Sequence, residues 1–470
     1  MNKYKKLITN TAVLALGTLG SKILVFLLMP LYTRLLTSAQ YSTADIISQT
    51  ANLLIPLISL GMYEAVFRFA MDKDIKSEKV LTTGLYVTLA GGAVFALFLP
   101  LLCKIEYFDG YFPLVYLYVV CASVHYLVSR YTRAIGENTL FAIQGIISTA
   151  LNITFNIIFL IGFGLGVTGY VLSVVLSDFL VSLFLFIKLG LFKKISPSDF
   201  SRSLFGRMLK YSVPLIPTTV FWWVTNVADR YIIRAVLDDS INGLYAAAFK
   251  IPTILLLLSS VFTEAWQFSA VVEKDEGGKK EHAEFFGVVF SSFQGMLFMS
   301  AALLIALSKI FASILFAPSY FDAWRYMPLL IAATVYSSLV TFMGSVYLVD
   351  KKSMLSFITA FAGAIINIVL NVLLIGPYGA NGAAFATFVC YVTVYIIRAI
   401  TTKRMIPFNQ HTVKVGLNTA LIIMQSLVLL AEYEYAYLVQ AFSIILIFAL
   451  NARPILAGAI KILKRKNNAA

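Results

Sequence analysis

The chain has 470 residues, of which 60% are hydrophobic and only 13% are charged, with a formal net charge of +14. Soluble domains average about 45–50% apolar and about 25% charged residues. This composition excludes an ordinary soluble protein and predicts an all-α integral membrane protein with many spanning helices.

A spanning helix needs about 20 mostly apolar residues. Reading the chain for such runs between polar breaks predicts fourteen spans. In chain order they cover residues 8–35, 42–70, 80–102, 112–132, 139–162, 167–187, 211–236, 243–271, 285–316, 326–349, 354–375, 381–399, 412–431 and 436–458. The basic start MNKYKK resembles that of a signal peptide, but the apolar run after it is too long, so we predict a retained first helix.

Lysine and arginine gather at both termini and in every second connection, with Arg130 and Arg398 counted among these connections. The positive-inside rule therefore predicts that both termini are cytoplasmic, and the positive charge reflects topology rather than a nucleic-acid partner. The opposite loops are short, and no HExxH or P-loop pattern is present. We predict a protein that is not an enzyme, with no cofactor and no metal site. His125 is expected to be buried or to line a cavity.

The second half of the chain is a divergent copy of the first. Asn152 and Asn156 align with Asn367 and Asn371, each 215 residues later, and Glu64 aligns with Glu264, 200 residues later. Each copy contains six predicted spans, so the copies are parallel repeats. The predicted parts are an N-terminal lobe 1–195, a cytoplasmic amphipathic linker 196–210, a C-terminal lobe 211–402, helices 13 and 14 over 410–460, and a basic cytoplasmic tail 461–470.

The repeated asparagines lie four residues apart, so each pair shares one face of a helix. A buried amide in lipid needs a partner, and the small residues Gly382 and Ala383 after the second pair allow close helix approach. Two interpretations are open: a structural hairpin, or direct contact of Asn367 or Asn371 with substrate.

Several charged residues lie inside predicted spans, where a charge costs on the order of 2.5–3.5 kcal/mol or more. Such residues usually face a water-filled cavity or a partner. The cationic candidates for substrate binding are Lys22, Arg34, Arg68, Arg230, Arg234 and Lys250. The candidates for ion coupling are Asp45, Glu64, Asp178, Asp229 and Glu264.

Simpler interpretations compete for some of these residues. Arg34 and Arg234 could extend to the outer interface, and Glu64 and Arg68, four residues apart, could form a plain ion pair. The aromatic residues Phe221, Trp222, Trp223 and Trp266 could stack on sugars or could be lipid-facing or core residues. A cationic cavity suits an anionic cargo, because phosphate groups pair with lysine and arginine.

Three stretches carry a family resemblance: GTLGSKILVFLLMPLYTRLLTSAQYSTADIISQTANLLIPLISLGMYEAVFRF, NVADRYIIRAVLDDSINGLYAAAFKI and INIVLNVLLIGPYGANGAAFAT. The sequence resembles the polysaccharide and O-antigen flippases of the multidrug/oligosaccharidyl-lipid/polysaccharide exporter superfamily, over about residues 5–400. Helix 1 departs from the pattern of other branches because it carries Lys22.

This resemblance implies export of undecaprenyl-diphosphate-linked oligosaccharide across the bacterial cytoplasmic membrane by alternating access through a central cationic cavity. In the peptidoglycan-precursor flippases of the same superfamily, helices 13 and 14 form a groove for the lipid tail, and the two extra spans of this chain could do likewise. The fused halves suggest that a monomer suffices, and membrane lipid and polysaccharide-assembly proteins are the further partners expected. A multidrug or cation antiporter and a lipid II flippase of the same superfamily are the alternatives. A membrane-embedded polymerase or ligase is disfavoured by the short outer loops.

Overall fold

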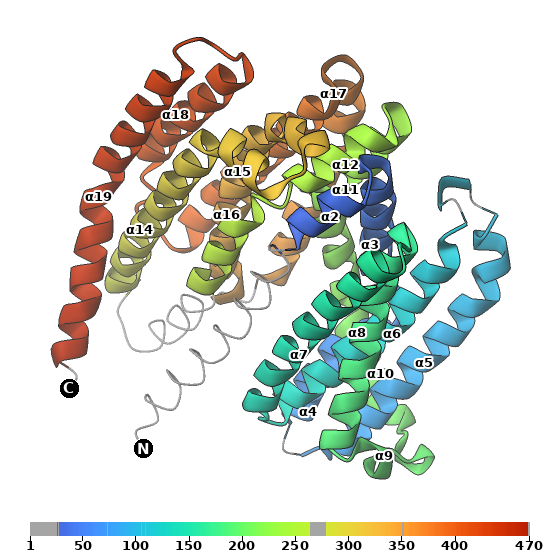
Figure 1. Ribbon diagram of the computed structural model, residues 1–470. Helices are drawn as coiled ribbons and strands as arrows, with labels where there is room; N and C mark the ends of the chain where they lie inside the picture. The colour runs from blue at the N-terminus through green and yellow to red at the C-terminus, as the bar shows by residue number, and fades with distance from the viewer. Residues whose placement is uncertain are drawn as a thin grey trace. The chain divides into compact units, whose positions relative to one another are not determined.

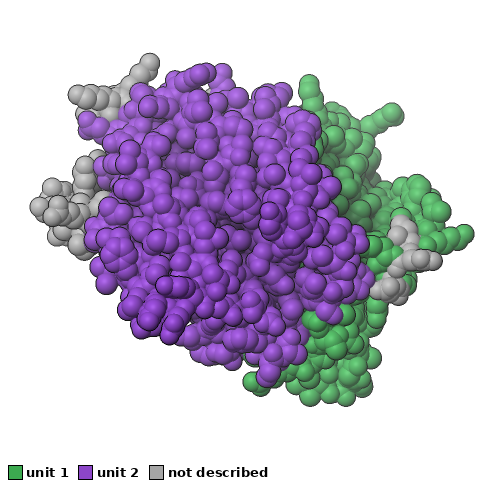
Figure 2. All heavy atoms as spheres, turned by 90° about the horizontal axis from the view of Figure 1, so that it is seen from above, with its two compact units in different colours: residues 1–223 green, residues 224–470 purple. Residues whose placement is uncertain are grey.

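The computed structural model describes Phe26 and residues 28–72, 74–104, 106–108, 110–263, 279–349 and 352–468. These residues form helices joined by turns, as predicted for an all-α membrane protein (Figure 1). The chain divides into two compact units, residues 1–223 and 224–470, coloured separately in Figure 2. The division falls inside α11, Ile216–Val236, which follows the predicted linker.

Unit 1 contains helices of the first six predicted spans and of the linker. They are α2 Met29–Leu35, α3 Ser38–Ile58, α4 Met62–Ala70, α5 Ser77–Leu102, α6 Phe112–Ala134, α7 Asn138–Asn156 with its π-helical continuation Ile157–Gly162, α8 Gly166–Lys188, α9 Leu191–Lys194 and α10 Arg202–Ser212. Helix α6 is central, because α3, α4, α5, α7 and α8 all pack against it.

Unit 2 begins within α11 and continues through the helices of the second repeat. They are α12 Asp239–Ala248, a helix Thr253–Thr263, α14 Lys279–Ala306, α15 Ser308–Leu315, the 3-10 segment Pro318–Arg325, α16 Met327–Val349, α17 Ser353–Met405, α18 Thr412–Leu430 and α19 Ala436–Asn468.

Among the described residues, eight helices are long and apolar enough to cross a membrane, or ten if each of two bent pairs counts as one span. The difference from the fourteen predicted spans has identifiable causes. Most of the first span lies outside the described residues. Helix α17 counts once although it covers two predicted spans, and the apolar part of α19, Ala436–Ala452, is short. Helix α11, which corresponds to the predicted span 211–236, is not among the candidates.

Helix α17 is a hairpin. Its backbone leaves the helical region at Gly379 (φ 61°, ψ −151°). Hydrogen bonds join residues far apart along it: Asn367 Nδ2 donates to Thr387 Oγ1 at 3.2 Å, and Arg398 Nε donates to Thr359 Oγ1 at 3.1 Å. A straight helix would separate the second pair by roughly 58 Å at 1.5 Å per residue. The two arms are therefore antiparallel, as predicted for spans 354–375 and 381–399.

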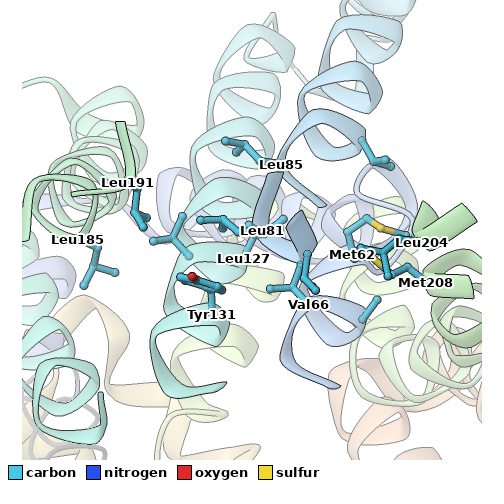
Figure 3. Close-up of a cluster of buried hydrophobic side chains, with 14 of the residues drawn as sticks. Met62, Val66, Leu81, Leu85, Leu127, Tyr131, Leu185, Leu191, Leu204 and Met208 are labelled. Atoms are coloured by element: carbon cyan, nitrogen blue, oxygen red, sulfur yellow. The ribbon is translucent and has the colours of Figure 1, made fainter. Parts of the chain in front are cut away.

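The hydrophobic core of unit 1 explains the amphipathic pattern of the linker. Leu204 and Met208 of α10 are buried in a cluster with Val66 of α4, Leu81 of α5 and Leu127 of α6 (Figure 3). Ser201 caps α10 by accepting a hydrogen bond from the Leu204 backbone at 3.3 Å. The apolar face of this helix thus packs against the other helices of its own unit.

The end of α3 is bent from α4 by 56°. Leu60 and Gly61 adopt left-handed backbone angles there, shortly after Pro56. The Ser212 hydroxyl donates to the Leu60 carbonyl at 2.7 Å and so satisfies a backbone group that the bend frees. Pro30, Pro214 and Pro217 instead lie within the first residues of helical segments, where proline is tolerated.

Glycine allows α5 to approach this bend closely. A Cβ atom on Gly91 would lie 2.0 Å from the Ile58 carbonyl oxygen. One on Gly84, two turns earlier on α5, would lie 2.5 Å from a methyl group of Val66. Small residues at such positions let membrane helices pack backbone to backbone. The corner between α3 and α4 therefore depends on the absence of a side chain at Gly91.

Gly91→Ala is expected to destabilise the protein by about 2–3 kcal/mol, because the new methyl group forces the α3 carbonyl and α5 apart. The measurement is thermal or denaturant unfolding in detergent. Gly145→Ala on α7 is the matched control, since a Cβ there meets no atom within 4 Å, and its gain in helix propensity should leave stability equal or higher by up to about 1 kcal/mol. Equal stability of the two variants would contradict this account of the corner.

Candidate functional site

The two asparagine pairs make the same hydrogen bonds in their separate units. Asn156 Nδ2 donates to the backbone and side-chain oxygens of Asn152 at 2.8 and 3.0 Å. Asn371 Nδ2 does the same to Asn367, at 2.9 Å for both oxygens. This agreement supports the duplication. It also favours the hairpin interpretation, because Asn367 goes on to join the other arm of α17 through Thr387.

A second set of buried hydrogen bonds joins α11 to its neighbours in unit 2. The Tyr245 hydroxyl of α12 donates to Asp229 Oδ2 at 2.6 Å, and the Tyr391 hydroxyl donates to Asn226 Oδ1 at 2.6 Å. Asp229 and Tyr245 are almost fully buried, with 1% and 0% exposure. The hairpin α17 and helix α12 thus supply hydrogen bonds to the polar side chains of α11. The sequence predicted Asp229 as a candidate, whereas Tyr245 was only one of the residues that carry the family resemblance.

The cationic candidates of unit 2 have different environments. The guanidinium of Arg230 is buried and lies 4.8 Å from the centre of the Phe249 ring. Arg234 forms a two-point contact with Asp239, through Nε to one carboxylate oxygen and through Nη2 to the other. Lys250 is half-buried in the break between α12 and the helix Thr253–Thr263, which are bent by 41°.

The break at Lys250 resembles a feature of transporter sites. Thr253 Oγ1 donates to the Lys250 carbonyl at 2.5 Å, and Pro252 occupies the turn between the two helices. Interrupted helices of this kind place backbone polar groups and side chains at membrane depth. Among the described cationic candidates of unit 2, Lys250 is the one that lies in such an interruption.

The described cationic candidates of unit 1 are exposed. Arg34 is exposed at the end of α2, and Arg68 is exposed near the end of α4. The ion pair considered between Glu64 and Arg68 is wrong: Glu64 Oε1 instead contacts Arg130 Nη2 of α6 at 3.1 Å. The packing of α4 on α6 brings Arg130 to Glu64, which sequence spacing alone cannot show.

The two remaining acids of unit 1 are buried. Asp45 is 4% exposed, and Gln49 one turn later donates to it at 3.4 Å. Asp178 is 8% exposed and contacts His125 Nδ1 at 2.7 Å. His125 is buried, as predicted from its position in an apolar run. Its pairing with Asp178 was not predicted.

Lys22, Glu264 and Trp266 lie outside the described residues. Trp223 uses its indole Nε1 to donate to the Gln49 carbonyl at 3.0 Å, so it contacts protein through its polar edge. Phe221 and Trp222 are half-buried on the same helix.

Arg398 was placed wrongly in a connection. It is 3% exposed and belongs to the second arm of α17. Its Nη1 donates to the Val340 carbonyl of α16 at 2.8 Å. A Cβ atom on Gly344 would lie 2.7 Å from Nη1, so the missing side chain of that glycine makes room for the guanidinium. Arg398 therefore links α16 to both arms of the hairpin.

Buried amides attach the last two helices to unit 2. Asn418 of α18 and Asn451 of α19 exchange hydrogen bonds with each other, and each also contacts Gln294 of α14, at 3.0 to 3.3 Å. All three side chains have 0% exposure. Gln425 and Gln440 form a second bridge between α18 and α19. The helices of the last two predicted spans, α18 and α19, are therefore specifically packed on the rest of unit 2, and they lie side by side in Figure 1.

These features define a class: a multi-pass α-helical membrane protein with duplicated asparagine hairpins and charged residues inside its helices. A family model described as "Polysaccharide biosynthesis protein" matches residues 7–267, more than half of the chain. The chain belongs to this polysaccharide biosynthesis protein family.

One curated relative is an uncharacterized membrane protein of Methanocaldococcus jannaschii, 20% identical over 261 residues. The match covers 53% of this chain and 61% of the relative, so it spans less than two thirds of that protein.

Solved structures show the same fold. A lipid II flippase MurJ in an inward closed conformation matches with a TM-score of 0.65 at 15% identity, over 96% of this chain and 100% of that chain. An inward-facing multidrug resistance MATE family transporter of the MOP superfamily matches with a TM-score of 0.61 at 14% identity, over 84% and 94%. Its outward-facing counterpart gives 0.60 at 16% identity, over 86% and 96%. The polysaccharide family predicted from the sequence is confirmed by the family model, and these solved structures show that the fold is shared.

The contact between Arg234 and Asp239 provides a test of a predicted binding residue. Asp239→Asn is expected to destabilise the protein by about 2–4 kcal/mol, because the Arg234 side chain, 7% exposed, then lacks that carboxylate. Exchanging the two residues, Arg234→Asp with Asp239→Arg, should restore part of the loss. The measurement is unfolding in detergent, followed by transport in liposomes.

Recovery of both stability and transport in the exchanged variant would assign Arg234 a structural role. Recovery of stability without transport would contradict that role and return Arg234 to the substrate-binding candidates.

Proposed function

We propose that this protein is a flippase that moves undecaprenyl-diphosphate-linked oligosaccharide across the bacterial cytoplasmic membrane for assembly of cell-surface polysaccharide. The observation that carries the proposal is the match of more than half of the chain to a polysaccharide biosynthesis family. The likeness to MurJ over almost all of the chain supports a transporter fold. The movement proposed is alternating access, with both termini in the cytoplasm as the lysine and arginine distribution predicts.

The charge of the membrane helices favours an anionic cargo. A diphosphate presents several oxygens that accept charge-assisted hydrogen bonds from lysine and arginine. Lys250, in the break after α12, and Arg230, buried on α11, are the described residues that we propose for this contact. Lys22 is proposed with them from its position in the predicted first span. Arg34 and Arg68, both exposed, are proposed to contact headgroups at the membrane surfaces.

The alternatives differ in cargo. A multidrug antiporter is consistent with the likeness to MATE transporters, and a lipid II flippase with the likeness to MurJ. A drug antiporter for cations would favour an acidic binding site, whereas the bent span of unit 2 places a lysine at its break. We propose a functional monomer, with polysaccharide-assembly proteins and membrane lipid as partners.

Lys250→Glu is expected to slow flipping at least about tenfold, equivalent to about 1.4 kcal/mol, because it places a negative charge where the diphosphate should bind. The assay uses proteoliposomes that contain an undecaprenyl-diphosphate oligosaccharide and follows how fast the sugar becomes accessible to an external glycosidase. Lys22→Glu is tested in parallel. Lys194→Glu is the matched control, because Lys194 is exposed on α9.

Wild-type flipping no faster than in empty liposomes would contradict the proposed function. Parallel liposomes with lipid II, or with a cationic dye and an ion gradient, would then show which alternative holds. If wild-type flipping is rapid and Lys250→Glu does not change its rate, the proposed function would be supported, but Lys250 would be excluded as a substrate-binding residue.

A further inference from the structure

A chain of four buried polar side chains joins three membrane helices of unit 1. Asp178 of α8 contacts His125 Nδ1 of α6 at 2.7 Å. His125 Nε2 lies 2.8 Å from Gln144 Oε1 of α7. Gln144 Nε2 donates to the Ser129 hydroxyl of α6 at 3.1 Å. All four residues are at most 9% exposed, and His125 and Asp178 both lie near the middle of their helices.

The hydrogen-bond pattern depends on a proton on His125. Both ring nitrogens face oxygen atoms, of Asp178 and of Gln144, so both must donate, and only the imidazolium form has two N–H groups. A neutral ring has one N–H, which the Asp178 carboxylate accepts. Nε2 then becomes an acceptor and faces the Gln144 amide oxygen, which is also an acceptor, so no hydrogen bond forms between them.

The chain can satisfy the neutral ring by one rotation. If the Gln144 amide turns by half a revolution, its NH₂ group donates to Nε2 and its oxygen accepts from the Ser129 hydroxyl. Every polar group again has a partner. The two proton states therefore correspond to two complete hydrogen-bond arrangements, which differ in what α7 donates and accepts across its contact with α6.

Electrostatics give the two states different costs. With the proton bound, His125 and Asp178 form a neutral pair, and without it the site carries one buried negative charge, which is costly at membrane depth. Arg130, a cation on the same helix, is engaged by Glu64 of α4. Three titratable groups of α6, Tyr118, Cys121 and Tyr126, lie within the electrostatic reach of Asp178. The neighbouring helices add further titratable groups, among them Tyr170 of α8, Asp45 of α3 and Tyr63 of α4.

We propose that His125, Asp178, Gln144 and Ser129 form a reversible proton-binding site that couples the transport cycle to a proton gradient. This inference rests on the proposed flippase function. The bound proton resides on His125 Nε2. When it is released, the Gln144 amide rotates and donates a hydrogen bond to the Nε2 lone pair. This rotation changes the contact of α7 with α6. Asp178 holds the ring in place and neutralises its charge, which assigns it a positioning role.

The first test measures proton binding without transport. Protein labelled with ¹³C and ¹⁵N in histidine is placed in nanodiscs, and the ring signals are followed by NMR between about pH 5 and 8, the range in which histidine usually titrates. The chain has three histidines, so His125→Gln identifies the relevant signal. The expected result is a doubly protonated ring at the low end that loses the Nε2 proton as pH rises. A ring that keeps one protonation state throughout would overturn the proposal.

Gln144→Leu sharpens this test, because leucine fills a similar volume but cannot rotate to cap either state. It is expected to shift the titration of His125 measurably while leaving the fold intact, as checked by unfolding. Gln144→Glu, which keeps an acceptor at the same position, is expected to hold the proton more tightly. Titration unchanged in both variants would overturn the role of the amide.

The second test measures coupling. In proteoliposomes, a pH gradient is expected to accelerate wild-type flipping, and His125→Gln and Asp178→Asn should lose this acceleration. The matched control His411→Gln should retain it, because His411 precedes α18 in unit 2. The assignment would be overturned if His125→Gln retained the acceleration while Asp45→Asn lost it. It would also be overturned if only a sodium gradient accelerated flipping.

The two tests separate the two proposals. A titrating His125 in a protein that flips none of the lipids offered would refute the proposed cargo and keep the proton site. Flipping of the oligosaccharide lipid by a protein whose His125 does not titrate would support the proposed cargo and refute the proton site.

Discussion

Water is absent from the hydrocarbon layer of a membrane, so each polar group on a spanning helix needs a partner within the protein. The described parts of both units follow from this constraint. The asparagine pairs satisfy their own helix and then, in unit 2, the opposite arm of the hairpin. Arg398 satisfies a carbonyl of α16, and hydrogen bonds of Asn418 and Asn451 with Gln294 attach α18 and α19 to α14. Polar contacts thus specify which apolar helices pack together.

Close packing makes these contacts possible. Hydrogen bonds between helices require short distances between their axes, and glycine shortens them at particular points. Gly91 admits the end of α3, Gly344 admits the Arg398 guanidinium, and Gly382 lets the two arms of α17 meet, since a Cβ there would lie 2.2 Å from the Leu374 carbonyl. In each case a residue without a side chain lies beside a backbone or a charged group that needs space.

The same constraint gives a buried titratable group its importance. A structural amide can be satisfied once, in one arrangement, as in the cluster of Gln294, Asn418 and Asn451. A histidine between a carboxylate and an amide has two complete arrangements, and the proton decides between them. Such a pair of states is what a transporter needs at a coupling site, because a ligand shifts an equilibrium only by interacting differently with its two states.

Much of the fold could be predicted from the sequence, since apolar length and helical spacing are local properties. The runs that predicted spans became helices throughout the described residues, and the hairpin turn at Gly379 falls in the predicted break. The asparagine pairs were found because four-residue spacing places them on one face. Candidate charges were found because an ionisable residue in an apolar run is conspicuous. The exact number of membrane-spanning helices and the environment of each charge could not be predicted.

Partners across helices are decided by tertiary packing. Glu64 pairs with Arg130, 66 positions away, rather than with Arg68 on its own helix. His125 meets Asp178 across 53 positions, and Gln144 and Ser129 gave no distinguishing signal. The sequence by itself determined which segments enter the membrane and that they form two related halves, because hydrophobicity and repetition are written along the chain. Only the tertiary structure decided which charges neutralise one another, because helix rotation and close approach arise from packing many side chains at once.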